Sequence, residues 1–488
     1  SARAATARRA GPLLVLVLLA GCAVGPDATP TDMALPAHWH GAAGAQKATL
    51  GEWWRDLGDP SLDALVADAV EGNLDVKTAM AKVREARALR HEAVGGLLPS
   101  LDGSASGTRR QTATSGTTAV GSLFQAGLDA TWEIDLFGAN GRALEAADAG
   151  AAASEADLDS ALLTLVGDVV TNYVELRGDQ ARVELARRTA RSQRETAALT
   201  RTKVEAGSAS AVDTAKAEAA AASTEAGIPT LEIAGAEAVH RLSVLTGREP
   251  GALAEALRRV RPIPAPRRRL PAGIPADVLT ARPDVRAAER RVAQYTAKLA
   301  ASEAALYPSV SLTGSISTSA SRPGDLGKGS TIAWSWGPSV TVPIFEGGRL
   351  MAARDASAAV RDEYLLAFRA AVLTALEDVE NALVATSKEK TRAAKLASAA
   401  ASYRRAAELS RALYTSGSSS FLDVLDAERS LYSAEDALIQ SRVLLTTDHV
   451  ALAKALGAGW RRPIDATRPE VVDTDTGPHL VGFGAGAR

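Results

Sequence analysis

The sequence predicts a mixed fold of long α-helices and transmembrane β-strands, arranged as two tandem repeats. The first observation is that motifs of the 488-residue chain recur at a spacing near 209 residues. The second is that each copy contains two tracts with apolar residues at every second position, the period of a β-strand. The third is that residues 100–228 and 344–462 contain no proline and are rich in Ala, Glu, Arg and Leu, which favours unusually long helices.

The N-terminal residues predict an export signal and a lipid anchor. Three arginines precede the apolar run 13–19 (LLVLVLL), which is too short to span a bilayer. The run ends in LAGC, which resembles the lipobox of bacterial lipoproteins. The resemblance implies a signal peptide over residues 1–21, cleavage before Cys22, and diacylglyceryl and acyl chains on Cys22 that anchor the segment 22–60. An ordinary signal peptide with an incidental cysteine is the alternative, and Ala23 is compatible with sorting to the outer membrane.

Composition argues against several classes of function. The formal net charge is −2 and no basic stripe stands out, so we expect no nucleic-acid partner. Cys22 is the one cysteine, which excludes a disulfide within the chain and a cysteine-based zinc site. His38 and His40 form a weak candidate metal pair and are interpreted as loop histidines. Because no nucleophile–base set, phosphate loop or metal cluster is found, we expect neither an enzyme nor a cofactor or metal site.

The internal repeat sets the domain boundaries. The matching positions, in order, are 73–76 and 282–285, 98–101 and 307–310, Gly207 and Gly417, Asp213 and Asp423, and Gly247 and Gly457. We therefore predict repeat 1 over residues 61–257, a proline-rich linker over 258–274, repeat 2 over 275–462, and a C-terminal tail over 463–488 that looks disordered.

Both repeats have the same predicted order of elements. A helix comes first, at 61–95 in repeat 1 and 283–306 in repeat 2, and a proline ends it. A β-hairpin follows, and a long helical hairpin completes the repeat. The β-hairpins are expected at about 100–137 and 309–345, and the helical hairpins at about 140–247 and 349–457.

The β-hairpins carry the pattern of strands that face lipid on one side and a lumen on the other. Apolar residues alternate with small polar ones over residues 332–344, and apolar residues share one face over residues 124–136. Trp132, Trp334 and Trp336 suit the lipid interface. The alternative is a soluble sheet with one solvent-exposed face, which shows the same alternation. However, these are the only predicted strands, and four could not bury a core for so long a chain.

Strand counting predicts an oligomer. The smallest membrane-spanning barrels use about eight strands, and unpaired strand edges are not tolerated in hydrocarbon. The four strands of one copy must therefore share a barrel with other subunits, around an open lumen lined by Ser, Thr and Gly. The Ser/Thr/Gly-rich stretches 104–122 and 319–330 are expected to be exposed loops at the hairpin ends.

The long helices predict a rod that stands outside the membrane. A helix over about residues 140–205 would reach about 100 Å at 1.5 Å per residue. Leu162, Val166, Val169 and Tyr173 recur at the spacing of a coiled-coil seam. The Glu, Arg and Asp content of this region is incompatible with hydrocarbon, so we expect a periplasmic coiled coil.

Several short segments point to a known family when they are taken in order. They are residues 22–27 (CAVGPD), 53–54 (WW), 59–62 (DPSL), 132–138 (WEIDLFG), 282–285 (RPDV), 343–348 (PIFEGG) and 422–427 (LDVLDA). Together they resemble the TolC/OprM/NodT-like outer membrane efflux channel lipoproteins, over nearly everything from residue 22 to about residue 460.

The resemblance implies a homotrimer with a twelve-stranded β-barrel continuous with a periplasmic α-barrel. It implies that the chain is the outer-membrane channel of a tripartite efflux system. Such a channel is a passive conduit for small molecules, with a periplasmic adaptor protein and an inner-membrane pump as partners. A channel for type I protein export and a lipid-anchored coiled-coil spacer are the alternatives. The spacer would be favoured if the predicted strands did not insert into membranes.

The turns between the long helices are the candidate gate. Gly207 and Gly417 are the predicted hairpin-tip turns, and a Ser-x-x-Asp motif follows each at the same offset, ending in Asp213 and Asp423. This spacing fits a helix capping box, in which the acid accepts from free backbone N–H groups at the start of the helix.

The family resemblance gives this tip a second role. In the family, the acids that match Asp423 and Asp426 line the periplasmic constriction, and Leu422 matches an apolar member of that gate. Rings of like charges disfavour full ionisation and attract cations. We therefore expect these residues, with Asp213, to form a closed, cation-attracting and pH-sensitive mouth. Some relatives carry an Arg two residues after the tip glycine that latches neighbouring helices. Ser419 stands there, so no such latch is expected.

Overall fold

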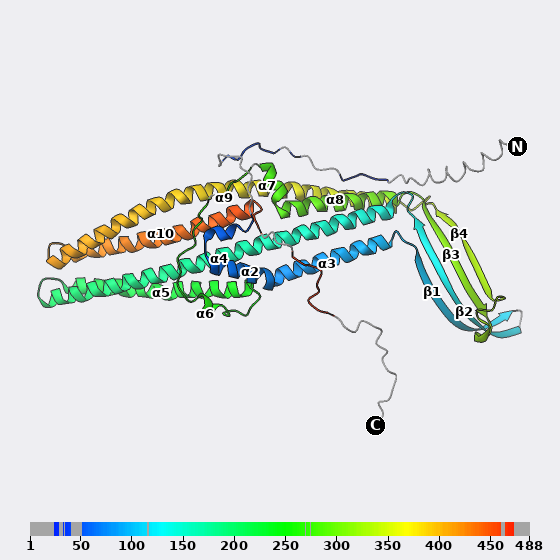
Figure 1. Cartoon of the computed structure of the whole chain (residues 1–488), viewed down its shortest axis with the longest axis horizontal. Helices are drawn as coiled ribbons and strands as arrows, with labels where there is room; N and C mark the ends of the chain where they lie inside the picture. The colour runs from blue at the N-terminus through cyan, green and yellow to red at the C-terminus, as the bar shows by residue number, and fades with distance from the viewer. Residues whose placement is uncertain are drawn as a thin grey trace, which may run out of the picture.

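The computed structural model describes residues 24–28, 33, 35–40, 51–114, 117–268, 270–273, 275–459 and 464–472. It shows a long rod of helices with one curved four-stranded sheet at its end (Figure 1). Within these residues, no helix combines the length and apolarity needed to cross a bilayer. The mixed fold of two tandem repeats is confirmed, while the expected signal peptide and Cys22 lie outside the described residues.

The two repeats contain matching elements. Repeat 1 consists of η1 (Trp53–Leu57), α2 (Pro60–Gly72), α3 (Leu74–Gly95), β1 (Ser100–Thr114), β2 (Thr117–Ile134), α4 (Ala139–Glu205), α5 (Ala211–Leu245) and α6 (Ala254–Leu257). Repeat 2 consists of α7 (Pro275–Ala281), α8 (Pro283–Ala304), β3 (Ser309–Ala320), η2 (Pro323–Asp325), β4 (Ile332–Thr341), α9 (Arg349–Ser416) and α10 (Phe421–Ala455). The 67 residues of α4 and the 68 residues of α9 make them nearly equal in length.

The single helix expected over residues 61–95 is wrong, because the chain forms two helices there. Asn73 has an extended backbone between α2 and α3. Its side-chain oxygen accepts from the backbone N–H groups of Asp75 and Val76, at 2.9 and 3.0 Å. Asn is among the preferred N-cap residues, so it ends one helix and starts the next. In repeat 2 the break falls before Pro283, between α7 and α8.

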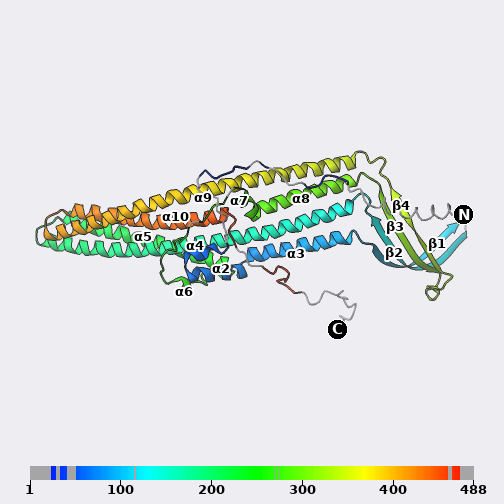
Figure 2. The same ribbon diagram turned by 45° about the horizontal axis from the view of Figure 1, so that its top comes forward.

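Helices α2 and α3 lie end to end along α4, and α8 packs against both α4 and α9, as Figures 1 and 2 show. The repeats secure this junction in the same way. In repeat 1 the side-chain amide of Asn73 donates to the carbonyl of Leu245, at the end of α5, at 3.0 Å. In repeat 2 the guanidinium of Arg282, the residue matching Asn73, donates to the carbonyl of Ala455, at the end of α10, at 3.2 Å. The repeat seen in the sequence thus extends to individual hydrogen bonds.

The sheet has the order β1-β2-β3-β4, and every neighbouring pair is antiparallel. Its register places the apolar residues of all four strands on one face, since Leu128 lies opposite Gly103 and Ile316, and Ile316 lies opposite Trp334. The other face carries mainly Ser, Thr, Gly and a few acids. Within the described residues β1 and β4 are each paired on one side only, which leaves two open edges.

The first hairpin has about the expected bounds, but its strands are longer than expected. Most of the stretch 104–122, predicted as a loop, is strand, because β1 runs to Thr114 and β2 begins at Thr117. Its small polar residues lack the apolar alternation, and they are nonetheless paired across the hairpin from Ser104, opposite Gly127, to Thr114. The second hairpin connects β3 to β4 through η2, close to the expected loop.

The main core lies midway along the rod, where the N-terminal segment and α2 cover α4. Trp53 and Trp54 are buried with Tyr173 and other apolar residues of α4. The Tyr173 hydroxyl donates to Asp59, which precedes α2, at 2.6 Å, and accepts from Arg177 at 3.0 Å. Burial, followed by the bond to Asp59, raises the pKa of Tyr173 to about 12. Arg177 is 1% exposed and also donates to the carbonyl of Arg259.

Part of the C-terminal tail is ordered. Residues 464–472 are described, and Ala466 is buried. Arg84 of α3 donates to the carbonyls of Ala466 and Arg468, at 3.1 and 3.0 Å. The expectation of a disordered tail is therefore wrong for these residues, while residues 473–488 lie outside the described part.

Candidate gate at the tip of the helical hairpins

Both hairpins reverse direction at a glycine with a left-handed backbone. Gly207 follows α4 with φ +72°, and Gly417 follows α9 with φ +83°. The residue after each glycine closes the helix end: the Ser208 N–H donates to the carbonyl of Lys203, and the Ser418 N–H to that of Leu413, both at 2.8 Å. Glycine adopts this conformation without steric cost. The structure thus places both predicted turns at the far end of the rod, away from the sheet (Figure 1).

Asp213 and Asp423 both act in capping boxes. The Asp423 carboxylate accepts from the backbone N–H of Ser420 at 3.0 Å, and the Asp423 N–H donates back to the Ser420 hydroxyl at 3.3 Å. Asp213 accepts from the Ser210 N–H at 3.3 Å. These bonds begin α10 and α5 directly after the turns, so both carboxylates have a structural duty at the tip.

Leu422 and Asp426 have no such duty. Leu422 is 62% exposed, and Asp426 is exposed with no hydrogen bond or ion pair within the described part of the chain. They lie four residues apart on α10, hence on one face. The opposite face is buried against the neighbouring helices, through Phe421, Val424 and Leu425. The first turns of α10 therefore present a leucine and two acids, including Asp423, to the outside of one subunit.

Sequence reasoning missed the contacts that hold the two hairpins of a subunit together near the tip. The hydroxyl of Tyr414, on α9, donates to that of Thr200, on α4, at 3.0 Å, and both residues are buried. Lys203 lies 5.0 Å from the centre of the Tyr414 ring and donates to the carbonyl of Thr415 at 3.4 Å. A tyrosine three residues before a turn glycine was the only available signal, and its partner is more than 200 residues away in the sequence.

A second set of contacts lies one to two turns further from the tip. Glu428 of α10 is 8% exposed, and it accepts from Thr196 of α4 at 3.1 Å. Arg411 of α9 forms an ion pair with Glu428 and donates to Ser192 of α4. Three helices from both hairpins thus meet at one buried carboxylate, which suits Glu428 because a buried charge requires a partner.

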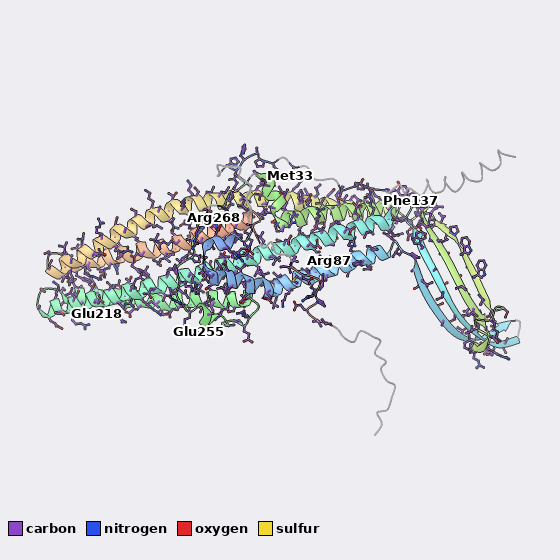
Figure 3. All side chains as sticks on the ribbon, viewed as in Figure 1. Met33, Arg87, Phe137, Glu218, Glu255 and Arg268 are labelled. Carbon is purple, nitrogen blue, oxygen red and sulfur yellow. The ribbon has the colours of Figure 1, made fainter. Side chains whose placement is uncertain are left out.

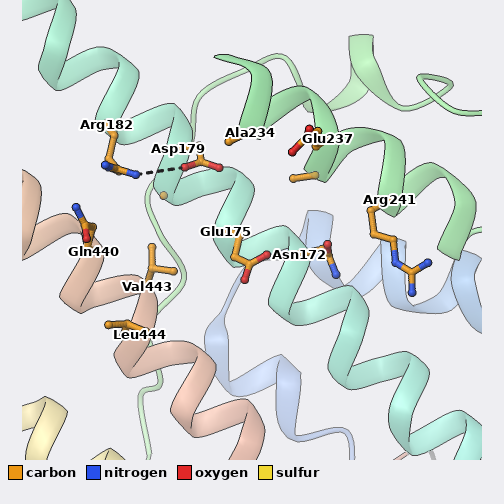
Figure 4. Close-up of a pocket in the computed structure, with 12 residues that line it drawn as sticks. Asn172, Glu175, Asp179, Arg182, Ala234, Glu237, Arg241, Gln440, Val443 and Leu444 are labelled. Carbon is orange, nitrogen blue, oxygen red and sulfur yellow. Dashed lines mark ion pairs between the residues drawn. The ribbon is translucent and has the colours of Figure 1, made fainter. Parts of the chain in front are cut away.

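The third set is the ion pair between Arg182 of α4 and Asp436 of α10, with contacts of 2.7 and 3.3 Å. It borders a hollow of about 570 Å³ on α4, between α5 and α10. Figure 4 shows Glu175 and Asp179 of α4 on one side of the hollow and Glu237 of α5 on the other. Burial raises the pKa of the Glu175 and Asp179 carboxyls above their usual range. No group of three or more His, Cys, Asp or Glu among the described residues is arranged to hold a metal ion.

The predicted interface tryptophans lie on the apolar face of the sheet. Trp334 and Trp336 are 70% and 74% exposed, and the register sets them level with Leu128 and Ala130, in the middle of the apolar face. Trp132 is 39% exposed, near the helix end of β2. Trp132 also donates to the carbonyl of Leu97 at 3.0 Å. Where the sheet meets the helices, Phe137 (labelled in Figure 3) stacks on Tyr307 with ring centres 5.1 Å apart.

Comparisons with known proteins agree over most of the chain. The model of the family described as "Outer membrane efflux protein" matches residues 65–248 and 274–458, one segment in each repeat. Nodulation protein T of Rhizobium leguminosarum bv. trifolii is 35% identical, covering 91% of this chain and 96% of the relative. The pyoverdine export outer membrane protein OpmQ of Pseudomonas aeruginosa is 33% identical, covering 91% and 95%. The solved structure of the outer-membrane channel OprN is 36% identical, with a TM-score of 0.85, and covers 90% of this chain and 100% of OprN.

Proposed function

This chain belongs to the outer membrane efflux protein family, and we propose that it acts as a passive conduit without catalytic activity. It is the outer-membrane channel subunit of an efflux system, and it works as a homotrimer with a periplasmic adaptor and an inner-membrane pump. The relatives named above include a pyoverdine exporter, so small molecules are the proposed cargo here.

One observation carries the conduit function: a short sheet with one apolar face continues directly into helices of more than sixty residues. At 1.5 Å per residue, α4 and α9 each extend about 100 Å, far beyond a bilayer. Three copies of the sheet supply twelve strands, enough to close a membrane barrel and to pair every open edge. The polar face of the sheet then lines the lumen.

A lipid anchor on Cys22 completes the proposed attachment to the membrane. Support comes from the sequence LAGC at the end of a short apolar run. A mature protein that begins at Cys22 with a diacylglyceryl group and an acyl chain is the expected result in mass spectrometry. A mature chain that begins at another residue would contradict it.

The contacts between the hairpins are proposed to keep the tip closed. Opening the end of the tube requires the α4–α5 and α9–α10 hairpins to separate. That movement must break the bond from Tyr414 to Thr200 and the pair between Arg182 and Asp436. A buried hydrogen bond is worth about 1 kcal/mol, so removing one should favour the open state roughly fivefold.

Single-channel recordings in planar bilayers test this latch. We expect Tyr414→Phe and Arg182→Gln each to raise the open probability roughly fivefold, and the double variant to raise it further. Arg404→Gln is the matched control, because Arg404 pairs with Glu435 inside one hairpin, between α9 and α10. A control that opens the channel as much as Arg182→Gln would contradict the latch.

The exposed acids at the tip are proposed to attract cations. Asp426→Asn should lower the preference of the channel for cations over anions, measured as a reversal potential in a salt gradient. The lumenal face of the sheet carries its own acids, since Asp102 lies directly opposite Asp129. Asp129→Asn is therefore measured beside it, to separate the two regions. Unchanged selectivity in both Asp423→Ala and Asp426→Ala would disprove a selective tip.

A further inference from the structure

We propose that Arg109 and Arg322 form a binding site for the phosphate groups of an anionic glycolipid in the outer leaflet of the membrane. The inference rests on the proposed function, which directs the loop end of the sheet away from the cell. The loop end is the one opposite the helical rod (Figure 2). The position of the two arginines at the membrane surface and their positive charge both favour lipid phosphate groups as the ligand.

The register of the sheet places Arg109 at the edge of the apolar band. On β2 the band runs from Phe124 to Ile134, at every second residue. Ten residues of strand extend about 34 Å, or about 24 Å at a tilt near 45°, which matches the roughly 25 Å apolar belt of membrane barrels. Gly107 lies opposite Phe124, in the last row of this band. Arg109 lies opposite Ser122, in the first row beyond it and on the same face.

Arg322 leaves the sheet at the same level. Ala320, the last residue of β3, lies opposite Phe124, and Arg322 follows two residues later. Gly107 of β1 lies opposite the same Phe124, so Arg322 and Arg109 each follow, by two residues, a position in this last row of the band. Two strand spacings separate the backbones of Ala320 and Gly107 by about 10 Å. The long side chains of Arg322 and Arg109 can therefore reach the phosphate groups of one lipid head group.

The charge at this end of the sheet is unbalanced. Residues 103–124 and 318–332 contain four basic residues and one acidic residue, Asp325. Lys328 is paired with Asp325. Arg109, Arg110 and Arg322 are exposed and have no carboxylate partner within the described part of the chain.

Arginine is well suited to bind phosphate, and the neighbouring Arg110 provides a control for Arg109. Its planar guanidinium binds phosphate oxygens in pairs, through charge-assisted hydrogen bonds. Arg110 is adjacent in sequence, at the same end of the sheet and with the same charge. Because successive residues of a strand face opposite sides, Arg110 lies on the lumenal face and cannot reach lipid.

Native mass spectrometry of the detergent-purified trimer with bis-phosphorylated lipid A tests the site. We expect Arg109→Gln/Arg322→Gln to lower the occupancy of bound lipid A at least tenfold, and Arg110→Gln to leave it unchanged. Monophosphorylated lipid A should bind more weakly to the native trimer. Phosphatidylcholine should not compete, and neither should millimolar inorganic phosphate.

Three outcomes would overturn the site: unchanged binding in the double variant, an equal loss in Arg110→Gln, or displacement of the lipid by inorganic phosphate alone. Channel conductance of the same preparations separates this proposal from the proposed function. If the double variant conducts normally but still binds lipid A, only the proposed glycolipid site is contradicted. If the native trimer does not conduct, the proposed channel function is contradicted instead.

Discussion

At the scale of single residues, the neighbouring carboxylates Asp423 and Asp426 at the start of α10 have different roles. Asp423 is bound to the backbone of Ser420, whereas Asp426, three residues later, is free within the described chain. The first repeat shows the contrast again, because Asp213 caps α5 and the position matching Asp426 is Lys216. The duplication kept the cap in both copies, and the exposed charge differs between them.

His449 should make the stability of the chain depend on pH. It is 3% exposed, with its ring centre 6.1 Å from that of Trp53. Burial, only partly offset by the charge of Asp56, lowers its pKa to about 4. Folding therefore favours the neutral ring. Its contribution is complete above the unfolded pKa of about 6.5, and about 3 kcal/mol is lost as the pH falls from there to about 4.

Thermal unfolding followed by circular dichroism at pH 7.5 and pH 5 measures this effect. The native chain should lose stability between the two values, and His449→Gln should lose less. The exposed His240 gives the control, and His240→Gln should behave as the native chain does. Equal pH dependence in all three proteins would rule out His449 as the cause.

Contacts between residues close in the sequence could be predicted from it, and contacts between distant residues could not. The capping boxes depend on a spacing of three residues, which the sequence displays. The contacts of Tyr414 with Thr200 and of Glu428 with Thr196 join residues more than 200 positions apart. The periodicity of apolar residues shows which face of a strand or helix is buried. It does not show which distant helix a side chain contacts. The latch between the hairpins therefore became visible only in the structure.

At the scale of elements, two glycines with the same backbone conformation should respond differently to substitution. Gly207 and Gly247 both have φ +72°. A Cβ at Gly207 would meet nothing within 4 Å, whereas one at Gly247 would lie 2.1 Å from the carbonyl oxygen of Gly72. Gly207→Ala should cost roughly 1 kcal/mol for its left-handed backbone. Gly247→Ala should cost several times more, because the ends of α2 and α5 would be forced apart.

Thermal unfolding of the two purified variants decides the matter. The shared backbone strain cancels in the comparison, so the difference between the unfolding temperatures reports the close approach alone. Equal losses would show that the junction between α2 and α5 adapts without cost.

Element lengths followed from proline and the apolar period, with two informative exceptions. Pro229 lies inside α5, and the helix continues through it on an exposed face. The break at Asn73 has no proline, and it arises from a cap in the middle of an otherwise helical pattern. A capping side chain competes with helix continuation through a local hydrogen bond, so the presence or absence of proline alone is an incomplete guide.

At the scale of the whole molecule, the sheet should tolerate a charge on one face only. Ile316 and Ser317 are consecutive on β3, and Ile316 lies on the apolar face, opposite Leu128 and Trp334. Ile316→Arg should cost about 2–4 kcal/mol in the bilayer and reduce the yield of inserted trimer. Ser317→Arg should insert normally and lower the single-channel conductance, because it narrows the lumen.

Membrane fractionation and electrophoresis of unheated samples measure insertion and trimer yield for both variants. If Ser317→Arg blocked insertion while Ile316→Arg did not, the assignment of the two faces would be reversed. The fold class and the need for several subunits could be predicted from strand counting, since four strands cannot close. The positions of the open edges at β1 and β4 required the structure.

Those open edges have a genetic consequence. Each barrel is closed by three subunits. One subunit with a damaged β1 or β4 therefore leaves the barrel open, even when the other two are intact. In a cell that makes both forms equally, only about one ring in eight would contain no damaged copy. Mutations at the sheet edges should therefore be dominant, whereas mutations that prevent a chain from folding at all should be recessive.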